Sequence, residues 1–315
     1  MRLHGNKYLG IKSWLKKEQS INREGGRNGS DNYRVHSNCI HQPKFCYSSL
    51  INMSKPSIIL ITASFSLPSF YDNIVNAVAA KGYEIKALHN PSSGTAPNEG
   101  REGAPPTMYD DAANIAKEAE KLADEGKDVI LVAHSYGGIP TSQSTKGLEK
   151  EERQKQGKKG GIVRLAYISC LVPPVGGSAG SLLVGVPDEQ KADLKIDEKG
   201  WMYQGDLALS ASISFSDIPK EDGLEFIKRF PRHSAISFAN ELTHGGYKNI
   251  PVSYLLCEED LCIPPAIQRE GIAMIEKESG KKVDVTSIKT GHTPVHEKSA
   301  PQKVIDWILD VAAKA

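Results

Sequence analysis

The segment at residues 128–138, Asp-Val-Ile-Leu-Val-Ala-His-Ser-Tyr-Gly-Gly, constrains the fold more than any other part of the chain. Its aliphatic and β-branched residues predict a buried strand, and the glycines after Ser135 predict a sharp turn into a helix. A hydroxyl on such a turn is exposed above the sheet edge, near the positive end of the helix that follows. We therefore expect Ser135 to be a nucleophile.

The residues two before and two after the serine must be small, because strand and helix pass closely at the turn. They are Ala133 and Gly137, so the chain departs from the usual Gly-x-Ser-x-Gly pattern by one methyl group. The short pattern alone is also compatible with an ordinary strand-turn-helix. The strand-like run before it favours the nucleophile.

The bulk composition is that of an ordinary globular protein. The chain has 315 residues, a net charge of +1 and 39% hydrophobic residues, which suit one large α/β domain or two small ones. This balance favours neither nucleic acid nor membrane as a partner, and no apolar run is long enough to cross a bilayer. The five cysteines have no metal-ligand spacing, which predicts reduced thiols, no metal site and a cytoplasmic location: Cys39, Cys46, Cys170, Cys257 and Cys262.

The first 52 residues differ from the rest. They contain nine Lys or Arg and three Asp or Glu, and they are rich in Asn, Ser and Gly. Such a composition cannot bury enough apolar surface to offset the entropy of ordering. We expect a disordered basic extension, or a misassigned start before Met53, and a folded domain over 53–315. Mitochondrial targeting by the leader stays open as an alternative.

Strand-like and helix-like segments alternate from Ser57 onward. This order predicts a mostly parallel, doubly wound α/β sheet, with function at the carboxyl ends of its strands. Residues 146–159 form a charged stretch, interpreted as solvated surface. The strand rhythm is lost over about 175–247, which predicts a small helical cap inserted over the sheet. The expected strands are 57–63, 83–88, 128–134, 162–169, 252–256 and 283–288, and the expected later helices are 223–230, 234–242, 265–278 and 302–312.

A serine needs a base within hydrogen-bond reach and a carboxylate that orients this base. In this type of fold the carboxylate and the histidine follow the serine in that order. Asp260 is the preferred carboxylate, just beyond the strand at 252–256, with Glu258 and Glu259 as rivals. His292 follows the last strand directly after a glycine, whereas His296 lies farther from the strand end. We expect Ser135, Asp260 and His292 to be the catalytic residues.

Donors are also needed for the oxyanion that forms on attack. The backbone N–H of Tyr136 is expected to supply one, and the loop around Ser64 and Phe65 the other. His134 precedes the serine, points away from it and is interpreted as a packing residue or a support for the turn.

With these three residues in this order, the chain resembles the α/β-hydrolase superfamily over 56–312. Four motifs carry a closer similarity to the branch containing plant methyl esterases, hydroxynitrile lyases and many fungal hydrolases. They are Pro-Ser-Ile-Ile-Leu-Ile at 56–61, Ala-His-Ser-Tyr-Gly-Gly at 133–138, Glu-Asp-Leu-Cys-Ile-Pro at 259–264 and Gly-His-Thr-Pro at 291–294. The resemblance implies a serine triad under a small helical cap, with no cofactor. The branch usually has His-Gly where this chain has Thr62-Ala63.

The expected activity is hydrolysis of a carboxylic ester or thioester of a small-molecule acyl substrate. Two alternatives stay open: hydroxynitrile-lyase-like cleavage of a carbon-carbon bond, which a lysine near the pocket would favour, and a non-catalytic ligand receptor. Substrate identity and oligomeric state are fixed by no motif. Candidate pocket walls are Phe65, Tyr136, Trp201 and Tyr203, and the basic cluster Arg229, Arg232 and His233 is interpreted as a solvated face or a site for an acidic substrate.

Overall fold

The central element of the computed structural model is a six-stranded sheet with strand order β2-β1-β3-β4-β8-β9. The structure describes residues 55–187 and 191–315, so the predicted basic leader, with Cys39 and Cys46, lies outside the described residues. Every strand pair of this sheet is parallel, as the alternation of strands and helices predicts. The strands are β1 (Ser57–Ile61), β2 (Ile85–Leu88), β3 (Asp128–His134), β4 (Gly161–Ile168), β8 (Val252–Cys257) and β9 (Asp284–Ile288).

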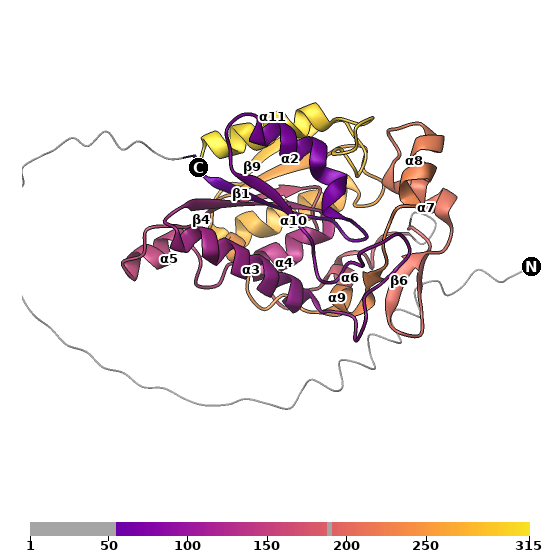
Figure 1. Ribbon diagram of the computed structural model, residues 1–315, viewed down its shortest axis with the longest axis horizontal. Helices are drawn as coiled ribbons and strands as arrows, with labels where there is room; N and C mark the ends of the chain where they lie inside the picture. Colours follow the sequence, from indigo (N-terminus) through magenta and orange to yellow (C-terminus); the bar gives the residue numbers. More distant parts are fainter. Residues whose placement is uncertain (1–54, 188–190) are drawn as a thin grey trace, which may run out of the picture.

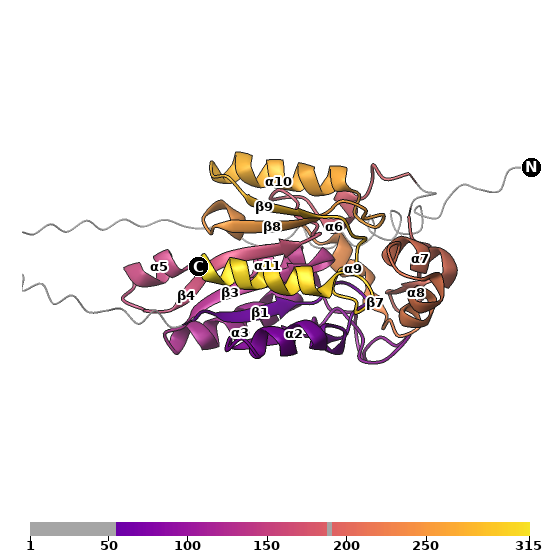
Figure 2. The same ribbon diagram turned by 90° about the horizontal axis from the view of Figure 1, so that it is seen from above.

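The strands are buried because helices cover both faces of the sheet (Figures 1 and 2). Alternate residues of β1 point to opposite faces, so Ile59 and Leu60 belong to different hydrophobic clusters. The cluster that includes Ile59 packs against α3 (Met108–Asp124), α4 (Gly138–Gln143) and α10 (Pro265–Ser279). The cluster that includes Leu60 packs against α2 (Asp72–Ala79) and α11 (Pro301–Ala313), which contact each other.

A capping box closes the N-terminus of α3. Thr107 caps α3 through its side chain, which accepts a hydrogen bond from the backbone N–H of Asp110. The Asp110 carboxylate in turn accepts from the backbone N–H of Thr107. This reciprocal capping box is what the Thr-x-x-Asp pattern predicts.

Residues 169–251, here called the insert, separate β4 from β8. The insert holds a three-stranded antiparallel sheet in the order β5-β6-β7, which the sequence analysis did not anticipate. It lies beyond one end of the parallel strands (Figure 1). Its elements are α6 (Ala179–Leu182), β5 (Leu194–Ile196), β6 (Trp201–Gln204), α7 (Leu207–Ser214), α8 (Lys220–Ile227), β7 (His233–Ser234) and α9 (Ala235–Ala239).

The charged stretch at 146–159 is not solvated throughout. It forms the short helix α5 (Lys150–Lys155), in which the Arg153 side chain is buried. Arg153 donates through Nε to the carbonyl oxygen of Gly160 at 2.8 Å and through Nη2 to Asp124 Oδ1 at 2.6 Å. This arginine therefore packs α5 against the body of the fold.

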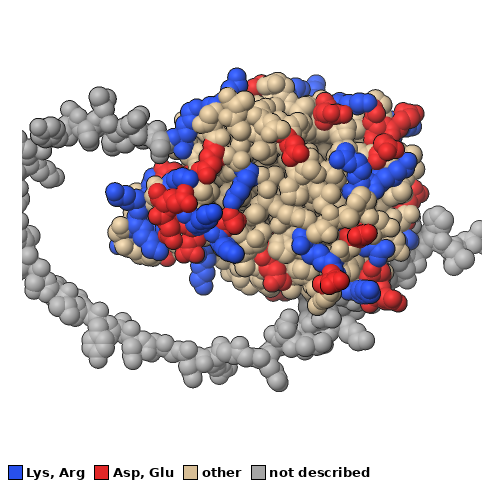
Figure 3. All heavy atoms as spheres, viewed as in Figure 1, with Lys and Arg blue, Asp and Glu red and all other residues tan. Residues whose placement is uncertain are grey.

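The surface carries charges of both signs. On the face shown in Figure 3, Lys and Arg side chains lie interspersed with Asp and Glu side chains. None of the helices in the described ranges has the length and apolar character that crossing a membrane requires.

Candidate active site

Ser135 occupies a strained turn at the carboxyl end of β3. Its φ is +57°, a left-handed conformation that costs a non-glycine residue free energy. A single 3₁₀ turn, Ser135–Gly137, joins β3 to α4, and the Ser135 carbonyl oxygen accepts from the backbone N–H of Leu171 at 3.1 Å. The packing around the turn thus holds the serine in the conformation expected from the sequence.

The small residues beside the serine are required by close backbone contacts. A Cβ at Gly137 would lie 2.8 Å from the carbonyl oxygen of Thr62, and one at Gly138 would lie 2.7 Å from the Cβ of Cys170. Ala133, at the position where the usual pattern has glycine, is fully buried, and its carbonyl oxygen accepts from Cys170 Sγ. The extra methyl group is therefore accommodated in the core.

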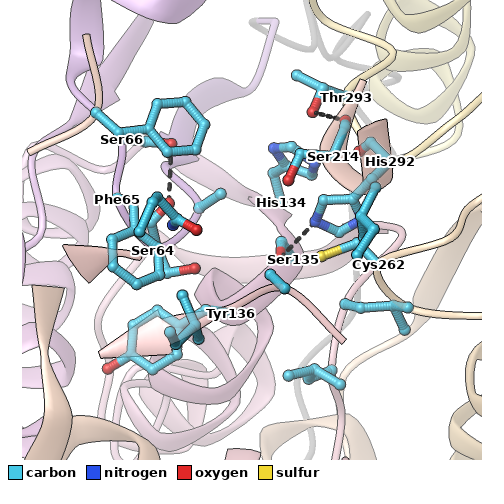
Figure 4. A pocket seen from close by; sticks show the side chains of 18 of the residues that line it. Ser64, Phe65, Ser66, His134, Ser135, Tyr136, Ser214, Cys262, His292 and Thr293 are labelled. Atoms are coloured by element: carbon cyan, nitrogen blue, oxygen red, sulfur yellow. Dashed lines mark hydrogen bonds between the residues drawn. The ribbon is translucent and has the colours of Figure 1, made fainter. Parts of the chain in front are cut away.

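His292 reaches Ser135 from the loop after β9 (Figure 4). Its Nε2 lies 2.9 Å from Ser135 Oγ, and its Nδ1 lies 2.8 Å from Asp260 Oδ2. Because the carboxylate can only accept, Nδ1 carries the proton and Nε2 is free to accept from the serine hydroxyl. The structure thus joins the three residues that the sequence analysis selected in one hydrogen-bonded chain, and all three are buried.

Asp260 is fixed from both sides. Its Oδ1 accepts from the backbone N–H groups of Cys262 and Ile263, each at 2.8 Å. Its Oδ2 accepts from Gln268 Nε2 at 3.2 Å in addition to His292. The rival carboxylates, Glu258 and Glu259, are exposed, whereas Asp260 is buried against His292.

Gln268 is a supporting residue that the sequence analysis missed. It lies fully buried in α10, where its amide also exchanges hydrogen bonds with the backbone of Cys257 and donates to the carbonyl oxygen of Ile263 at 2.8 Å. The same side chain therefore holds both ends of the loop that carries Asp260. A glutamine in an amphipathic helix gives no sequence signal of this role.

The surroundings of His292 favour its charged form. Burial lowers the pKa of this imidazole, but the negative charge of Asp260 and interactions with Cys262 outweigh burial. The net result is a pKa well above the usual value of 6.5. An imidazole that gains a proton easily suits the transfer of a proton from the serine hydroxyl.

His134 links the loop of His292 to Tyr71, in the 3₁₀ turn Pro68–Tyr71. Its Nδ1 lies 2.9 Å from the Tyr71 hydroxyl, and its Nε2 lies 2.9 Å from the carbonyl oxygen of His292. Since a carbonyl oxygen can only accept, Nε2 carries the proton of the neutral ring, and Nδ1 accepts from the Tyr71 hydroxyl. The Tyr71 hydroxyl oxygen also accepts from the backbone N–H of Ala63. Burial, together with the nearby His292, lowers the pKa of His134 to about 3, which keeps it neutral.

The expected oxyanion donors surround the serine. Figure 4 shows Ser135 between the Ser64–Phe65 segment and His292, with Tyr136 beside it. Phe65 has a φ of +55°, so the loop after β1 is also held in a special conformation. Among the loops and turns that the structure describes, no backbone carbonyl oxygen accepts a hydrogen bond from the N–H of Ser64, Phe65 or Tyr136.

Ser135 opens into a largely apolar cavity between the sheet edge and the insert. Phe65 and Tyr136 line it, as expected, but Trp201 and Tyr203 do not. Trp201 packs against Gly100, and Tyr203 lies under the guanidinium of Arg232 at 5.0 Å. The main apolar lining residues from outside the insert are Phe70, Ile263 and Val295, and those from the insert are Leu171, Leu183, Val186, Ile213, Phe226, Phe230 and Phe238.

The three basic residues 229, 232 and 233 do not form one site. The Arg229 guanidinium lies over the rings of Phe70 and Phe226, and Arg232 pairs with Asp197. His233 is fully buried, and burial lowers its pKa to about 3. Arg229 is exposed and Arg232 partly exposed, as the solvated-face interpretation predicts, whereas the buried His233 does not fit it.

Metal-ligating clusters are absent from the part of the chain that the structure describes. No group of three or more His, Cys, Asp or Glu side chains there is arranged to hold a metal ion. The cysteines among the described residues, Cys170, Cys257 and Cys262, are all free thiols.

Two fungal proteins are similar to the chain over almost their whole length. "Probable hydrolase R7" of Phoma sp. is 31% identical over 261 residues, which cover 82% of this chain and 99% of the relative. "Alpha/beta hydrolase nvfD" of Aspergillus novofumigatus is 29% identical over 264 residues, which cover 84% of this chain and 99% of the relative.

Solved structures show the same fold. A pyrethroid hydrolase from Sphingobium faniae JZ-2 matches 82% of this chain and 97% of its own, with a TM-score of 0.63 and 21% identity. Polyneuridine aldehyde esterase matches 82% of this chain and 100% of its own, with a TM-score of 0.63 and 17% identity. The model of the alpha/beta hydrolase family matches residues 63–307. The α/β fold and the superfamily resemblance predicted from the sequence are thereby confirmed, and the chain belongs to the alpha/beta hydrolase family.

Proposed function

We propose that the protein is a serine hydrolase that cleaves uncharged carboxylic esters or thioesters through an acyl-enzyme. One observation carries this proposal: the hydrogen-bonded chain Ser135–His292–Asp260, whose serine stands on a backbone with a φ of +57°. A strained position is retained where function depends on it. The names of the fungal relatives, both hydrolases, support the general class of reaction.

The proposed reaction uses each side chain in a distinct way. Ser135 Oγ attacks the carbonyl carbon while His292 Nε2 takes the serine proton, and Asp260 orients the imidazole and stabilises its positive charge. The tetrahedral intermediate collapses, and the departing alcohol or thiol receives the proton from His292. Water, deprotonated by His292, then attacks the acyl-enzyme and releases the carboxylic acid with Ser135 restored.

The oxyanion of the intermediate would lie among backbone donors. We assign this role to the N–H of Tyr136 and to an N–H of the Ser64–Phe65 segment. Both lie beside the serine and are without acceptors in the described loops and turns. Donors that are already in place lower the activation barrier because they need no reorganisation during the reaction.

The cavity lining indicates the polarity of the substrate. Lys191 is the one Lys, Arg, Asp or Glu among the described lining residues, whereas phenylalanines come from both the core and the insert. Phe70 and Phe226 have ring centroids 4.8 Å apart, and Phe65 and Phe230 are stacked at 6.4 Å. We infer that the insert acts as a cap whose aromatic wall accepts a bulky, uncharged acyl or alcohol group, because burying a charge there would be costly.

The proposal is tested with a panel of p-nitrophenyl esters of short aliphatic, long aliphatic and aromatic acids. We expect hydrolysis by the wild type and loss of at least about a thousandfold in kcat for Ser135→Ala. Ser212→Ala, at an exposed serine of the insert, is the matched control and should keep full activity. A fluorophosphonate should label Ser135. Full ester turnover by Ser135→Ala would overturn the proposal.

Substrate polarity is tested separately with dimethyl terephthalate and its monomethyl ester. The two share the ring and the scissile group and differ in one carboxylate. We expect kcat/KM to be at least about tenfold higher for the diester, because a carboxylate packed against the aromatic wall loses its hydration, and Lys191 is the single Lys or Arg among the described lining residues that could compensate. Equal values would contradict an uncharged substrate without affecting the assignment of Ser135.

Carbon-carbon bond cleavage remains the second candidate for one reason: Lys191 of the insert lines the cavity. A cation there could stabilise a departing cyanide. Turnover of aromatic cyanohydrins without turnover of any ester would favour this reaction, and loss of that turnover in Lys191→Met would assign the lysine to it.

A further inference from the structure

A buried carboxylate lies next to the proposed oxyanion donor. Asp111, in the first turn of α3, is fully buried and accepts three hydrogen bonds. The donors are the backbone N–H of Ser92 at 2.8 Å, the Ser92 hydroxyl at 2.6 Å and the Tyr136 hydroxyl at 2.7 Å. Asp111 is not part of the Ser135–His292–Asp260 chain and does not itself line the cavity.

The carboxylate has no ion-pair partner among the residues that the structure describes. The nearby Arg101 directs its guanidinium to the carbonyl oxygens of Ser93 and Asn90. Burying an unpaired carboxylate is costly for folding, so a neutral residue would suit the helix better if stability alone mattered.

Tyr136 is held at every part of its side chain. Its ring stacks on Phe238 with centroids 5.2 Å apart and an interplanar angle of 3°, and the edge of His233 packs against it at 4.8 Å. Its hydroxyl is held by Asp111. Fixing both ends of the side chain also fixes the backbone of residue 136, which directly follows the strained φ at Ser135.

The same network reaches the other proposed oxyanion donor. Two residues before Ser92, Asn90 donates through Nδ2 to the carbonyl oxygen of Thr62 at 2.9 Å. Thr62 precedes Ala63, whose N–H is held by Tyr71, and the Ser64–Phe65 segment follows. The loop that begins at Asn90 therefore ties the backbone on both sides of Ser135 to α3.

We infer that Asp111 is a positioning residue for the oxyanion site: it holds the Tyr136 side chain and thereby aims the Tyr136 backbone N–H at the developing oxyanion. The inference rests on the proposed function. It assigns Asp111 no contact with substrate. The effect should appear in the transition state, because a backbone donor displaced by a fraction of an ångström still permits substrate binding.

The test is a double-mutant cycle of Asp111→Asn and Tyr136→Phe, measured with the best p-nitrophenyl ester. Both substitutions keep the side-chain shape. Tyr136→Phe removes the hydroxyl that donates to Asp111, and Asp111→Asn replaces the charged acceptor by an amide, which can hold that hydroxyl only through a weaker, neutral hydrogen bond. We expect each single variant to lower kcat about tenfold with KM changed by less than about twofold. The double variant should have the same kcat as the less active single variant, because Asp111 acts through Tyr136. The affinity for a trifluoromethyl ketone inhibitor should fall in parallel with kcat.

Asp110→Asn is the matched control, since Asp110 is the neighbouring carboxylate in the same helix turn. It removes part of the capping box and should lower the free energy of unfolding without changing kcat. The inference is overturned if Asp111→Asn behaves like this control, or if it lowers kcat as much in the Tyr136→Phe background as in the wild type. A wild type that neither hydrolyses esters nor reacts with a fluorophosphonate overturns the proposed function and this inference together.

Discussion

His134 Nε2 donates to the carbonyl oxygen of His292, 2.9 Å away and 158 positions later in the chain. The residue immediately before the proposed nucleophile thus holds the loop of the proposed base. β3 therefore positions both residues. Ser135 directly follows its last residue, His134, and the backbone of His292 is hydrogen-bonded to the His134 side chain.

Replacing His134 tests this link. His134→Leu has a similar volume but leaves the buried Tyr71 hydroxyl and the His292 carbonyl oxygen without their partner. We expect the free energy of unfolding to fall by about 2–4 kcal/mol and kcat to fall about tenfold. Urea unfolding and steady-state kinetics check both numbers. His244→Leu, at a partly exposed histidine, should change each by much less, and a comparable kcat loss there would show that the effect is not specific.

The pH dependence of the reaction should follow His292. Only the neutral imidazole can accept the serine proton, so kcat/KM should rise with pH through the pKa of His292, with a midpoint above 6.5. Asp260→Asn removes the charge that raises this pKa. We expect the midpoint to move to lower pH and kcat to fall about 10³- to 10⁴-fold. An unshifted midpoint would assign the acid limb to another group.

His292 should also make stability depend on pH. Because its folded pKa is above its unfolded value, the interaction with Asp260 contributes fully below about pH 6.5 and is lost as pH rises through the folded pKa. Comparing the wild type with Asp260→Asn by urea unfolding across this range measures the contribution. The difference between the two proteins should shrink on the alkaline side.

Asp111 should make stability depend on pH in the acid range. Burial raises the pKa of Asp111 from 3.8 to about 6, against the opposing hydrogen bonds from Ser92 and Tyr136. The folded state holds this proton more tightly, so the contribution of Asp111 to the free energy of unfolding is greatest below pH 3.8 and is lost as pH rises through about 6. Relative to Asp111→Asn, which does not titrate, the wild type should lose roughly 3 kcal/mol across that window. Urea unfolding of both proteins at pH 4.5 and pH 7 measures most of the difference, and a constant difference would refute the assignment.

The close packing at Gly137 can be tested against a glycine with open surroundings. In Gly137→Ala the new Cβ meets the Thr62 carbonyl oxygen, which is backbone and cannot turn aside. We expect a loss of about 1–3 kcal/mol in the free energy of unfolding and a lower kcat. Gly185→Ala, where nothing lies within 4 Å of the added Cβ, should be nearly neutral in both. Thermal unfolding and kinetics of the pair provide the comparison.

The parallel sheet and the residues at its carboxyl edge were predictable from sequence for a physical reason. Buried parallel strands are continuous apolar runs, and β3 and β8 stand out as such. Since their ends converge at one edge, Asp260 and the more distant His292 could be assigned to the same place as Ser135. The predicted strand 57–63 ends earlier, at Ile61. The next two residues form hydrogen bonds with side chains instead of with a neighbouring strand: the Thr62 carbonyl oxygen accepts from Asn90, and the Ala63 N–H donates to Tyr71.

The insert and the supporting residues were not predictable in the same way. Strand β5 has three residues and β7 has two, too few for an alternating pattern. Trp201 was expected in the pocket, but its packing on Gly100 depends on a loop a hundred residues earlier. Asp111 looks in sequence like any acidic residue in a first helical turn, and only its three-dimensional contacts with Ser92 and Tyr136 distinguish it.

At Ser135 the residue that is best for stability differs from the residue that the proposed reaction needs, because the backbone there is left-handed. Glycine adopts a φ of +57° without the steric penalty that serine bears, so Ser135→Gly removes about 1 kcal/mol or more of strain together with the hydroxyl. Directed evolution of this protein for heat resistance alone would therefore favour loss of the proposed nucleophile. Any such campaign needs turnover, and not only solubility or melting temperature, as its selection criterion.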